Sequence, residues 1–350
     1  MTLSNIFFGK KVVQQAYLNN ALIYKSKGWE TLPSTCSEVW TKSYDKINGI
    51  YSNIVKDNSD NLYVSSKNSV YKIDSEGNLK WKYVISDTTM TTSIVVFPTY
   101  IYCAYVNITG TNLGYVAKID TNGNLISTVD IHSLAPNSVS SYFNDMQKDN
   151  NNIYAITPTY LLKLNQDLKV IDNINISSYT GYATTRIAIN NGPYIFVGTT
   201  NYGFRFDKSN FKNSISLPGA GLESNFNITA LKMDNIGNLY ASSFVSPCVA
   251  LKYDVETCKL ITTLYIDVSY DICTDRQENV YFAYLNSYSK LKKYSSDGTL
   301  ILDNIQIPAL DATKNTIKIV TDSNNNIYVA YVDNNSKLAI KKFINLVKEN

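Results

Sequence analysis

The sequence predicts an all-β protein, a seven-bladed β-propeller with a small module of β-strands at its N-terminus. Three observations support this prediction. A phrase typical of a β-hairpin recurs along most of the 350 residues, each unit has room for four short strands, and a second turn motif recurs inside the units. A chain of this length could hold two average domains, but the repeats favour one large domain.

The recurring phrase is clearest at residues 231–240, LKMDNIGNLY. Apolar and polar residues alternate into Asp234, a turn follows, and a second apolar run opens with Leu239, which is the pattern of a β-hairpin. Related phrases are IVKDNSDNLY (54–63), MQKDNNNIY (146–154), ICTDRQENVY (272–281) and IVTDSNNNIY (319–328), and degenerate copies end at 102 and 196. The closing aromatic residues are Tyr63, Tyr102, Tyr154, Phe196, Tyr240, Tyr281 and Tyr328, separated by 39, 52, 42, 44, 41 and 47 residues. These residues define seven units.

Residues 1–30 do not match the repeat. They predict three short strands at 6–8, 11–18 and 21–24, because Gly9-Lys10 and Asn19-Asn20 are suited to tight turns. A sheet this small is marginal alone, so we expect this N-terminal module to pack on the main domain or on another protein. Residues 31–37 are interpreted as a linker.

The first complete unit predicts strands at 53–56, 62–65, 69–73 and 79–85. The turn before its fourth strand reads DSEGN, and similar turns occur in KIDTNGNL (118–125) and KYSSDGTL (293–300). The glycine is lost in KLNQDLKV (163–170) and KYDVETCKL (252–260). In such turns the aspartate side chain fixes the backbone and the glycine supplies the left-handed residue.

The last unit supplies only three strands, near 317–320, 327–332 and 338–343. A closed ring needs a fourth, because an open edge leaves backbone groups unpaired. Residues 38–44, EVWTKSY, resemble the fourth strand of the first unit, with Trp40 in the role of Trp81. We therefore predict that they complete the last blade of a propeller domain spanning 38–350. The competing candidate is the tail, residues 344–348.

Composition excludes some classes of partner. Charged residues make up 17% of the chain and the net charge is only +3, so nucleic acid is not an expected partner. The N-terminus lacks the features of a signal peptide and the chain lacks a long apolar run, so we expect synthesis in a cytoplasm and no membrane insertion. Delivery to the outside by assembly into a particle or by lysis stays open.

Tyrosine is unusually frequent, with 28 residues. One interpretation is that tyrosine serves as a β-former whose ring lies on the sheet and whose hydroxyl reaches the wet edge. The other is a sugar-binding or polymer-binding surface. The five cysteines, Cys36, Cys103, Cys248, Cys258 and Cys273, contain no CxxC pair and are predicted to be buried free thiols, with Cys248 and Cys258 the only close pair.

No catalytic, cofactor-binding or metal-binding residue is predicted. His132 is the only histidine and is expected to be a turn or surface residue, and no HExxH, P-loop or GxGxxG motif occurs. The aspartates of the turns could suggest calcium, but no loop offers six converging oxygens, so we interpret them as turn formers. They are Asp57, Asp60, Asp149, Asp234, Asp275 and Asp322. A carboxylate pair for glycoside hydrolysis could still come from different blades.

The chain also carries two resemblances to known families. Residues 5–29, NIFFGKKVVQQAYLNNALIYKSKGW, are similar to an N-terminal segment of tail and baseplate proteins of phages that infect Gram-positive bacteria, and the alternative is an ordinary N-terminal hairpin. The repeats in residues 45–343 resemble bacterial β-propeller repeats of the form D-x-x-G-N-x-Y-V and K-x-D-x-x-G-N. The second resemblance implies the architecture and is silent on activity.

Together, the resemblance of the N-terminus to phage tail proteins, the absent signal peptide and the missing catalytic set favour a virion structural protein of the tail or baseplate that is not an enzyme. Residues 1–30 would anchor it to other tail or baseplate proteins, and the propeller, oligomeric in the particle, would face host cell-wall polysaccharide, teichoic acid or a neighbouring protein. The alternative is a polysaccharide lyase or glycoside hydrolase. A convergent acid or Tyr/Arg set in the central funnel favours the enzyme, and a plain funnel favours display. A cell-surface adhesion module would need a signal or a sortase motif.

Overall fold

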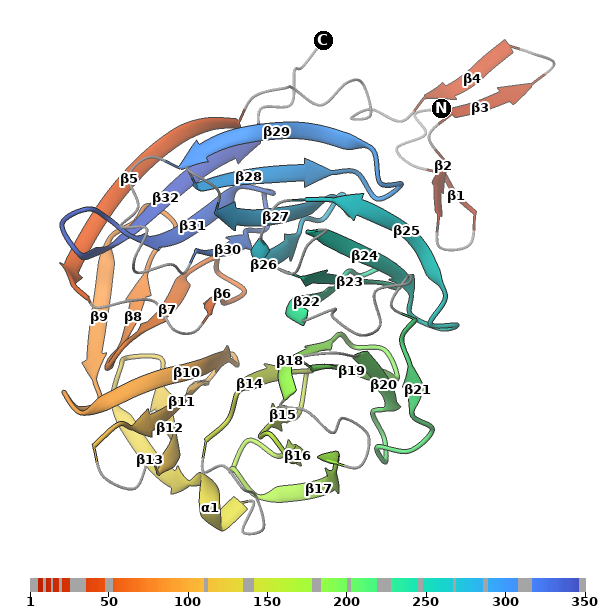
Figure 1. The fold of residues 1–350 in the computed structure, drawn as a ribbon. Helices are drawn as coiled ribbons and strands as arrows, with labels where there is room; N and C mark the ends of the chain where they lie inside the picture. Colours follow the sequence, from red (N-terminus) through yellow and green to blue (C-terminus); the bar gives the residue numbers. More distant parts are fainter. Residues whose placement is uncertain are drawn as a thin grey trace.

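The computed structural model describes residues 6–8, 11–13, 15–18, 21–25, 36–47, 53–109, 113–134, 142–177, 184–199, 203–218, 228–243, 248–266, 269–285, 289–307 and 317–345. These residues form seven four-stranded antiparallel sheets and two two-stranded ones. The four-stranded sheets are arranged radially around a common centre (Figure 1). The predicted seven-bladed propeller is thus confirmed.

Each blade is a meander whose first strand lies nearest the centre (Figure 1). Blades 1 to 3 consist of β6 (Ile54–Lys56), β7 (Leu62–Ser66), β8 (Ser69–Ile73) and β9 (Leu79–Val84); β10 (Thr89–Val96), β11 (Tyr100–Asn107), β12 (Gly114–Asp120) and β13 (Leu125–Asp130); and β14 (Asp145–Lys148), β15 (Ile153–Ile156), β16 (Tyr160–Leu164) and β17 (Val170–Asn175). A short helix, α1 (Ile131–Leu134), follows β13.

The remaining blades follow the same order. Blades 4 to 6 consist of β18 (Thr184–Ile189), β19 (Tyr194–Thr199), β20 (Gly203–Asp207) and β21 (Ile215–Ser216); β22 (Ile228–Met233), β23 (Asn238–Ser243), β24 (Val249–Asp254) and β25 (Leu260–Tyr265); and β26 (Ser269–Thr274), β27 (Val280–Leu285), β28 (Ser289–Tyr294) and β29 (Leu300–Ile307). Blade 7 takes β30 (Lys318–Thr321), β31 (Ile327–Val332) and β32 (Lys337–Asn345) from the C-terminal end of the chain.

The fourth strand of blade 7 is β5 (Cys36–Lys46), which pairs antiparallel with β32 from Asn345 opposite Cys36 to Lys337 opposite Lys46. This is the edge position that the sequence predicts for residues 38–44. The strand begins two residues earlier than expected, so Cys36 and Ser37 belong to the blade and not to the linker. Ile344, the first residue of the competing tail candidate, extends β32, because its backbone pairs with Ser37. Residues 346–348 of that candidate and residues 31–35 of the expected linker lie outside the described residues.

The N-terminal module differs from the prediction in its pairing. The expected middle strand, 11–18, is divided into β2 (Lys11–Val13) and β3 (Gln15–Leu18). β1 (Ile6–Phe8) pairs with β2, and β4 (Ala21–Lys25) pairs with β3, so two hairpins replace the predicted three-stranded sheet. The residues that flank the two predicted turns pair with each other, Phe8 opposite Lys11 and Leu18 opposite Ala21.

The core lies between neighbouring blades, and the aromatic residues that close the recurring phrase are its repeated element. All seven lie in the second strand of a blade and are at most 1% exposed. In five blades the tyrosine hydroxyl donates to the aspartate six or five residues earlier, for example Tyr281 to Asp275 at 2.8 Å. These rings are therefore packing residues, as the first interpretation of tyrosine proposed, but their hydroxyls bind a turn carboxylate.

A cation stands directly opposite each of these aromatic residues on the third strand. The cross-strand pairs are Tyr63–Lys72, Tyr102–Lys118, Tyr154–Lys163, Phe196–Arg205, Tyr240–Lys252, Tyr281–Lys293 and Tyr328–Lys342. Lys72 Nζ lies 5.5 Å from the ring centre of Tyr63 and donates to the Thr121 carbonyl of the next blade at 3.2 Å. Lys118, Arg205, Lys252 and Lys342 likewise donate to a backbone carbonyl of the next blade, so in five blades this cation links two sheets.

The turns before the fourth strands explain two of the recurring features of the repeats. Gly77 and Gly123 have φ values of +79° and +91°, and a Cβ at either position would lie 2.8–2.9 Å from a side chain of the preceding blade. For Gly123 that side chain is Trp81, and for Gly77 it includes Trp40 as well as a lysine. Trp40 and Trp81 therefore occupy matching places, as the sequence predicted.

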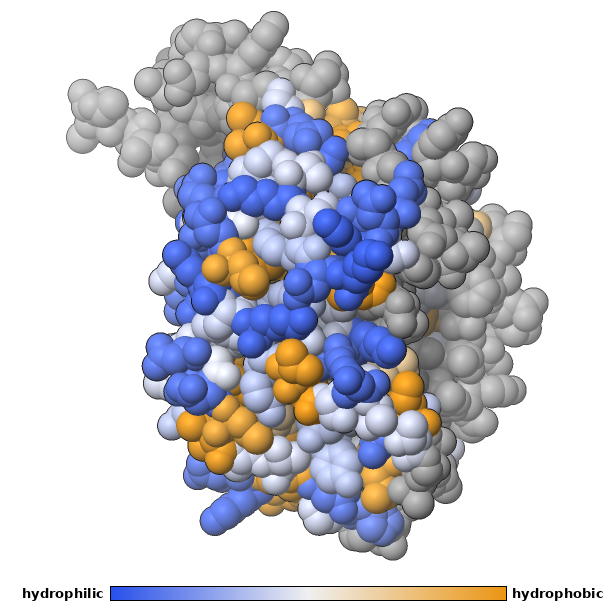
Figure 2. Space-filling model, turned by 90° about the vertical axis from the view of Figure 1, so that its left-hand side faces the viewer, coloured by the Kyte–Doolittle hydropathy of each residue, from blue (hydrophilic) through white to orange (hydrophobic). Residues whose placement is uncertain are grey.

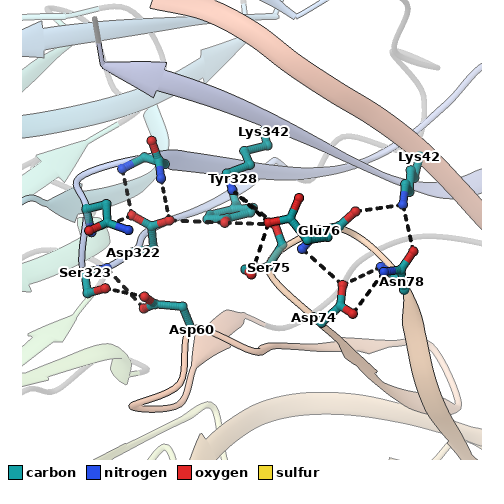
Figure 3. A network of polar contacts seen from close by, with 12 residues as sticks. Lys42, Asp60, Asp74, Ser75, Glu76, Asn78, Asp322, Ser323, Tyr328 and Lys342 are labelled. Carbon is teal, nitrogen blue, oxygen red and sulfur yellow. Dashed lines mark hydrogen bonds and ion pairs between the residues drawn. The ribbon is translucent and has the colours of Figure 1, made fainter. Parts of the chain in front are cut away.

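The contact between blades 7 and 1 closes the ring. Lys342 of β32 donates to the Ser75 carbonyl of blade 1 at 3.2 Å, and Tyr328 donates to the same oxygen at 3.3 Å (Figure 3). Lys42 of β5 donates to the Glu76 carbonyl at 2.7 Å (Figure 3). Both termini of the propeller domain therefore bind the same turn of blade 1.

A second set of contacts joins the turns between the first and second strands. Asp60, Glu278 and Asn325 take the left-handed position of these turns, with φ values of 59°, 63° and 64°. Each accepts a hydrogen bond from a backbone N–H in the turn of the preceding blade. The donors are Ser323 for Asp60 at 3.1 Å, Asn235 for Glu278 at 3.3 Å, and Arg276 for Asn325 at 2.9 Å. We call these three contacts the turn clasps, and the first of them appears in Figure 3.

The outer strands are the most exposed part of the sheets. On the side of the molecule that includes β5 and β9, hydrophobic residues form separate patches among hydrophilic ones (Figure 2). Leu79 and Val84 of β9 are 44% and 50% exposed, and Val39 of β5 is 47% exposed. In the part of the chain that the structure describes, no helix is long and apolar enough to cross a membrane.

Candidate functional site

The centre of the propeller contains a cavity of about 500 Å³. Its walls are the first strands of all seven blades, and its rim is formed by the turns that follow these strands, including Asn150, Asn191, Asn235 and Arg276. We call the side of the propeller that carries these turns the turn face. The first strand of a blade has no neighbour on its inner edge, so its backbone groups face this cavity.

One position of the first strand carries a charged side chain in four blades, and three of these side chains, Asp145, Arg186 and Asp271, line the cavity. This position lies four residues before the start of the turn, and its occupants in blades 1 to 7 are Asn53, Ser93, Asp145, Arg186, Ala230, Asp271 and Lys318. The next position is apolar in every blade and buried, with Ile54, Ile94, Met146, Ile187, Leu231, Ile272 and Ile319. Two aspartates and two cations therefore occur in one ring, each aspartate preceding its cation by one blade.

Asp145 joins three blades. Its Oδ1 accepts from the Ser93 hydroxyl of blade 2 at 3.2 Å and from the backbone N–H of Met146 at 2.9 Å, and its Oδ2 accepts from the N–H of Ile187 in blade 4 at 3.0 Å. Burial raises the pKa of Asp145, while Arg186 and these hydrogen bonds oppose that shift. Both oxygens of this carboxylate are thus engaged by protein donors.

Asp271 repeats the arrangement between blades 6 and 7. Its Oδ2 accepts from the N–H of Ile319 at 2.9 Å, and its Oδ1 lies 3.9 Å from Lys318 Nζ. Burial lowers the pKa of Lys318, and the Asp271 carboxylate opposes this shift. Both ring aspartates therefore bind the free inner edge of the next blade, because each accepts from the same strand position in that blade.

Four other cations line the cavity, and one of them, Lys56, pairs with Asp60 at 2.7 Å. The remaining three are Lys148, Lys232 and Arg276. Lys148 ends β14, Lys232 lies on β22 and Arg276 lies in the turn after β26. Lys148 Nζ is 4.7 Å from the ring centre of Phe97, and burial lowers its pKa. Among the described residues, none lies in an ion pair or side-chain hydrogen bond with the terminal nitrogens of these three cations.

The aspartates of the turns are occupied by the turns themselves. Asp322 Oδ1 accepts from the N–H groups of Asn324 and Asn326, both at 2.8 Å, and its Oδ2 accepts from Asn326 Nδ2 at 2.7 Å (Figure 3). Asp57, Asp234 and Asp275 make the same contacts, and Asp149 makes a shorter version. Asp60 differs, since it forms a turn clasp. Within the described residues no cluster of three acidic, histidine or cysteine side chains could hold a metal.

The remaining candidates of the sequence analysis lie away from the cavity or are buried thiols. His132 is exposed in α1, where its N–H donates to the Asp130 carboxylate at 2.7 Å. No disulfide joins the five cysteines, all of which the structure describes, and three of them, Cys103, Cys258 and Cys273, are buried. Cys36 and Cys248 are only half-buried, which corrects the expectation for these two. Burial raises the pKa of Cys36 to about 11.

The central funnel therefore contains charged side chains, and none of its described lining residues is aromatic. Its charged ring was missed because the repeats were aligned on the closing aromatic residues and the turns. The signal was nevertheless present, since counting back four residues from each turn gives Asp145, Arg186, Asp271 and Lys318 directly.

Comparison with known proteins finds similarity in structure but not in sequence. No protein-family model matches the chain, and no curated protein is similar to it. Virginiamycin B lyase from Staphylococcus aureus has a TM-score of 0.67 at 11% identity, over 88% of this chain and 99% of its own. A chain of the mitotic checkpoint complex gives 0.70 at 10% identity, over 89% of this chain and 95% of its own. The WD40 propeller of Doa1 gives 0.65 at 10% identity, over 89% and 97%. This likeness shows the fold alone.

Proposed function

We propose that this protein is a binding propeller of a phage tail or baseplate that displays its turn face to the host cell wall and performs no chemistry there. The observation that carries this proposal is the state of the carboxylates in the cavity. Asp145 and Asp271 accept hydrogen bonds from the inner edges of neighbouring blades, and the other lining acids close turns. A general acid or base needs an oxygen that faces substrate, whereas both oxygens of Asp145 and Oδ2 of Asp271 hold the ring together, and Asp271 Oδ1 lies 3.9 Å from Lys318 Nζ.

The N-terminal segment supports the location in a particle. Its two hairpins, β1–β2 and β3–β4, are each two-stranded, and a two-stranded hairpin is marginally stable without a partner. The resemblance of residues 5–29 to phage tail and baseplate segments supplies the class of partner, another tail or baseplate protein.

Two experiments test the proposal. Deletion of residues 1–30 should abolish incorporation into virions while the propeller still folds, as circular dichroism of the purified fragment would show. Unaltered incorporation would refute the anchor. Separately, the purified full chain should sediment with isolated Gram-positive cell walls, and failure to bind walls of any host of the phage would refute the display function.

A wall-degrading enzyme is the second candidate, because the convergent Asp145, Arg186 and Asp271 meet the criterion that favours catalysis. Incubation of the full chain with purified wall polymers, followed by mass spectrometry of the soluble fraction, distinguishes the two. Release of fragments that is lost in an Asp271→Asn variant of unchanged thermal stability would establish the enzyme. Intact polymer supports the binding propeller.

A further inference from the structure

We infer that the central cavity binds a phosphate-bearing polyol chain through Lys148, Lys232 and Arg276; this inference rests on the proposed function and names the part of the wall polymer that is recognised. Three features of the cavity lead to it. They are three cations without an ion pair or side-chain hydrogen bond to described residues, carboxylates that already accept backbone N–H donors, and the absence of aromatic rings among the described lining residues.

The three cations come from different blades, 3, 5 and 6, and all line the same cavity. Lys148 and Lys232 are half-buried, and Arg276 is exposed at the rim. A half-buried ammonium group without an acceptor is unfavourable, and the lowered pKa of Lys148 reflects this cost of burial. An anion that brings its own oxygens would supply the missing acceptors.

The acids of the cavity do not fill this role. The lining contains five, Asp145, Asp149, Asp271, Asp275 and Asp322, and each accepts at least one backbone N–H donor. Two of them also form ion pairs with lysines other than Lys148 and Lys232, since Asp149 lies 3.4 Å from Lys208 and Asp275 lies 3.8 Å from Lys293. The charges of the lining residues sum to zero. The N–H groups of Lys148, Lys232 and Arg276 nevertheless remain available as hydrogen-bond donors, because the carboxylates already accept hydrogen bonds from other groups.

The neutral side chains of the cavity indicate what accompanies the anion. Six amides line it, and one of them, Asn190, bonds to Asp234 and Gly192 through its side chain. No hydrogen bond joins the side chains of the other five to described residues; they are Asn53, Gln147, Asn150, Asn191 and Asn235. Amides both donate to and accept from hydroxyl groups, so they suit a chain that carries alcohols beside its charges. A volume of 500 Å³ lies within the range of roughly 300–1,000 Å³ that small-molecule sites occupy.

Other anions fit less well. Nucleic acids bind to open grooves with aromatic side chains on which the bases stack, and sugar rings likewise pack on aromatic faces, but the described lining contains neither tyrosine, phenylalanine nor tryptophan. A flexible polyol phosphate needs no stacking platform. Its phosphate oxygens would accept from the lysines and from Arg276, and its hydroxyls would bind the amides.

The test uses the full chain and a soluble poly(glycerol phosphate) in isothermal titration calorimetry. Lys148→Gln combined with Lys232→Gln should weaken binding about tenfold or more, the loss expected for charge-assisted hydrogen bonds. The matched control combines Lys169→Gln with Lys212→Gln, two exposed lysines outside the cavity, and should leave affinity unchanged. Arg276→Gln alone removes an exposed side chain and serves if the double variant does not fold.

The outcomes separate this inference from the proposed function. Equal binding of the soluble chain by the wild type and the Lys148/Lys232 variant would overturn the cavity site, even if both proteins still sediment with walls. Binding of the soluble chain that depends on these lysines would support the site, even if intact walls are not bound and the display function fails. Tighter binding of a single-stranded oligonucleotide than of poly(glycerol phosphate) would also overturn the inference.

Discussion

Replacement of Asp60 by alanine should weaken the closure of the ring between blades 7 and 1. Asp60 accepts from the backbone N–H of Ser323 at 3.1 Å and from its hydroxyl (Figure 3), and it pairs with Lys56 at 2.7 Å. Hydrogen bonds to a charged group contribute about 1.5–3 kcal/mol each, and a partly exposed ion pair contributes about 0–1 kcal/mol. The left-handed φ of 59° persists in the variant and is less favourable for alanine than for aspartate.

Summed with allowance for coupling between these contacts, the variant should lose about 2–4 kcal/mol of unfolding free energy at pH 7. Urea denaturation followed by tryptophan fluorescence measures this loss. Because Ser323 and Lys56 lower the pKa of Asp60 against the opposing effect of burial, the stabilisation is present above the usual aspartate pKa and is lost as the pH falls through the lowered value. The difference between wild type and variant should therefore shrink in acid.

The matched control is Asp167→Ala, an aspartate with a side chain 74% exposed and a long contact to Lys118, which should cost less than about 1 kcal/mol. Asp60→Gly gives a second check, since glycine relieves the left-handed backbone and should recover about 1 kcal/mol relative to alanine. If Asp60→Ala unfolds at the same urea concentration as the wild type, the clasp does not hold the ring closed and the reasoning is wrong.

Three further predictions concern single turns and strands. Burial, reinforced by nearby carboxylates, raises the pKa of Glu278 to about 7, so its ionisation should cost about 1–3 kcal/mol of unfolding free energy as the pH rises from 5 to 8. Glu278→Gln should remove this part of the pH dependence of thermal unfolding. An unchanged pH profile would contradict the assignment. Gly123→Ala should lose about 2 kcal/mol or more in urea denaturation because its Cβ would meet Trp81 at 2.9 Å and φ is +91°, and Trp81→Ala in the same chain should recover part of that loss. Tyr281→Phe removes the buried hydroxyl bound to Asp275 at 2.8 Å and should lower the unfolding free energy by about 1–3 kcal/mol; a neutral effect would show that the hydroxyl is dispensable.

The blades could be predicted because their chemistry is local. A turn aspartate that caps the backbone two and four residues later, and a tyrosine six residues later that binds it, lie within one hairpin and recur as a readable phrase. Asp275 and Tyr281 show this arrangement in full. The glycines of the second turn were equally readable, and where they are missing Leu168 and Cys258 take the left-handed position with φ of 59° and 57°.

The cavity and the turn clasps depend on contacts between blades, and a single hairpin contains no information about its neighbour. Asp60 and Ser323 are 263 residues apart in the chain, and only the closed ring brings their turns together. Asp145 likewise looks like an ordinary strand residue until Ile187 is known to present its N–H from the next blade. The start of β5 at Cys36 was missed for a similar reason, because the partner that extends it is the far end of β32.

The pairing of Cys36 with Asn345 also has a mechanical consequence. A pull exerted through residues 1–30 would enter the propeller at the first residue of β5, and its component along β5 would act on the antiparallel ladder with β32. Under this shear component the hydrogen bonds between the two strands bear the force together and do not rupture one after another. Under the proposed attachment, the ladder of hydrogen bonds between β5 and β32 would thus also resist the drag of an attached cell.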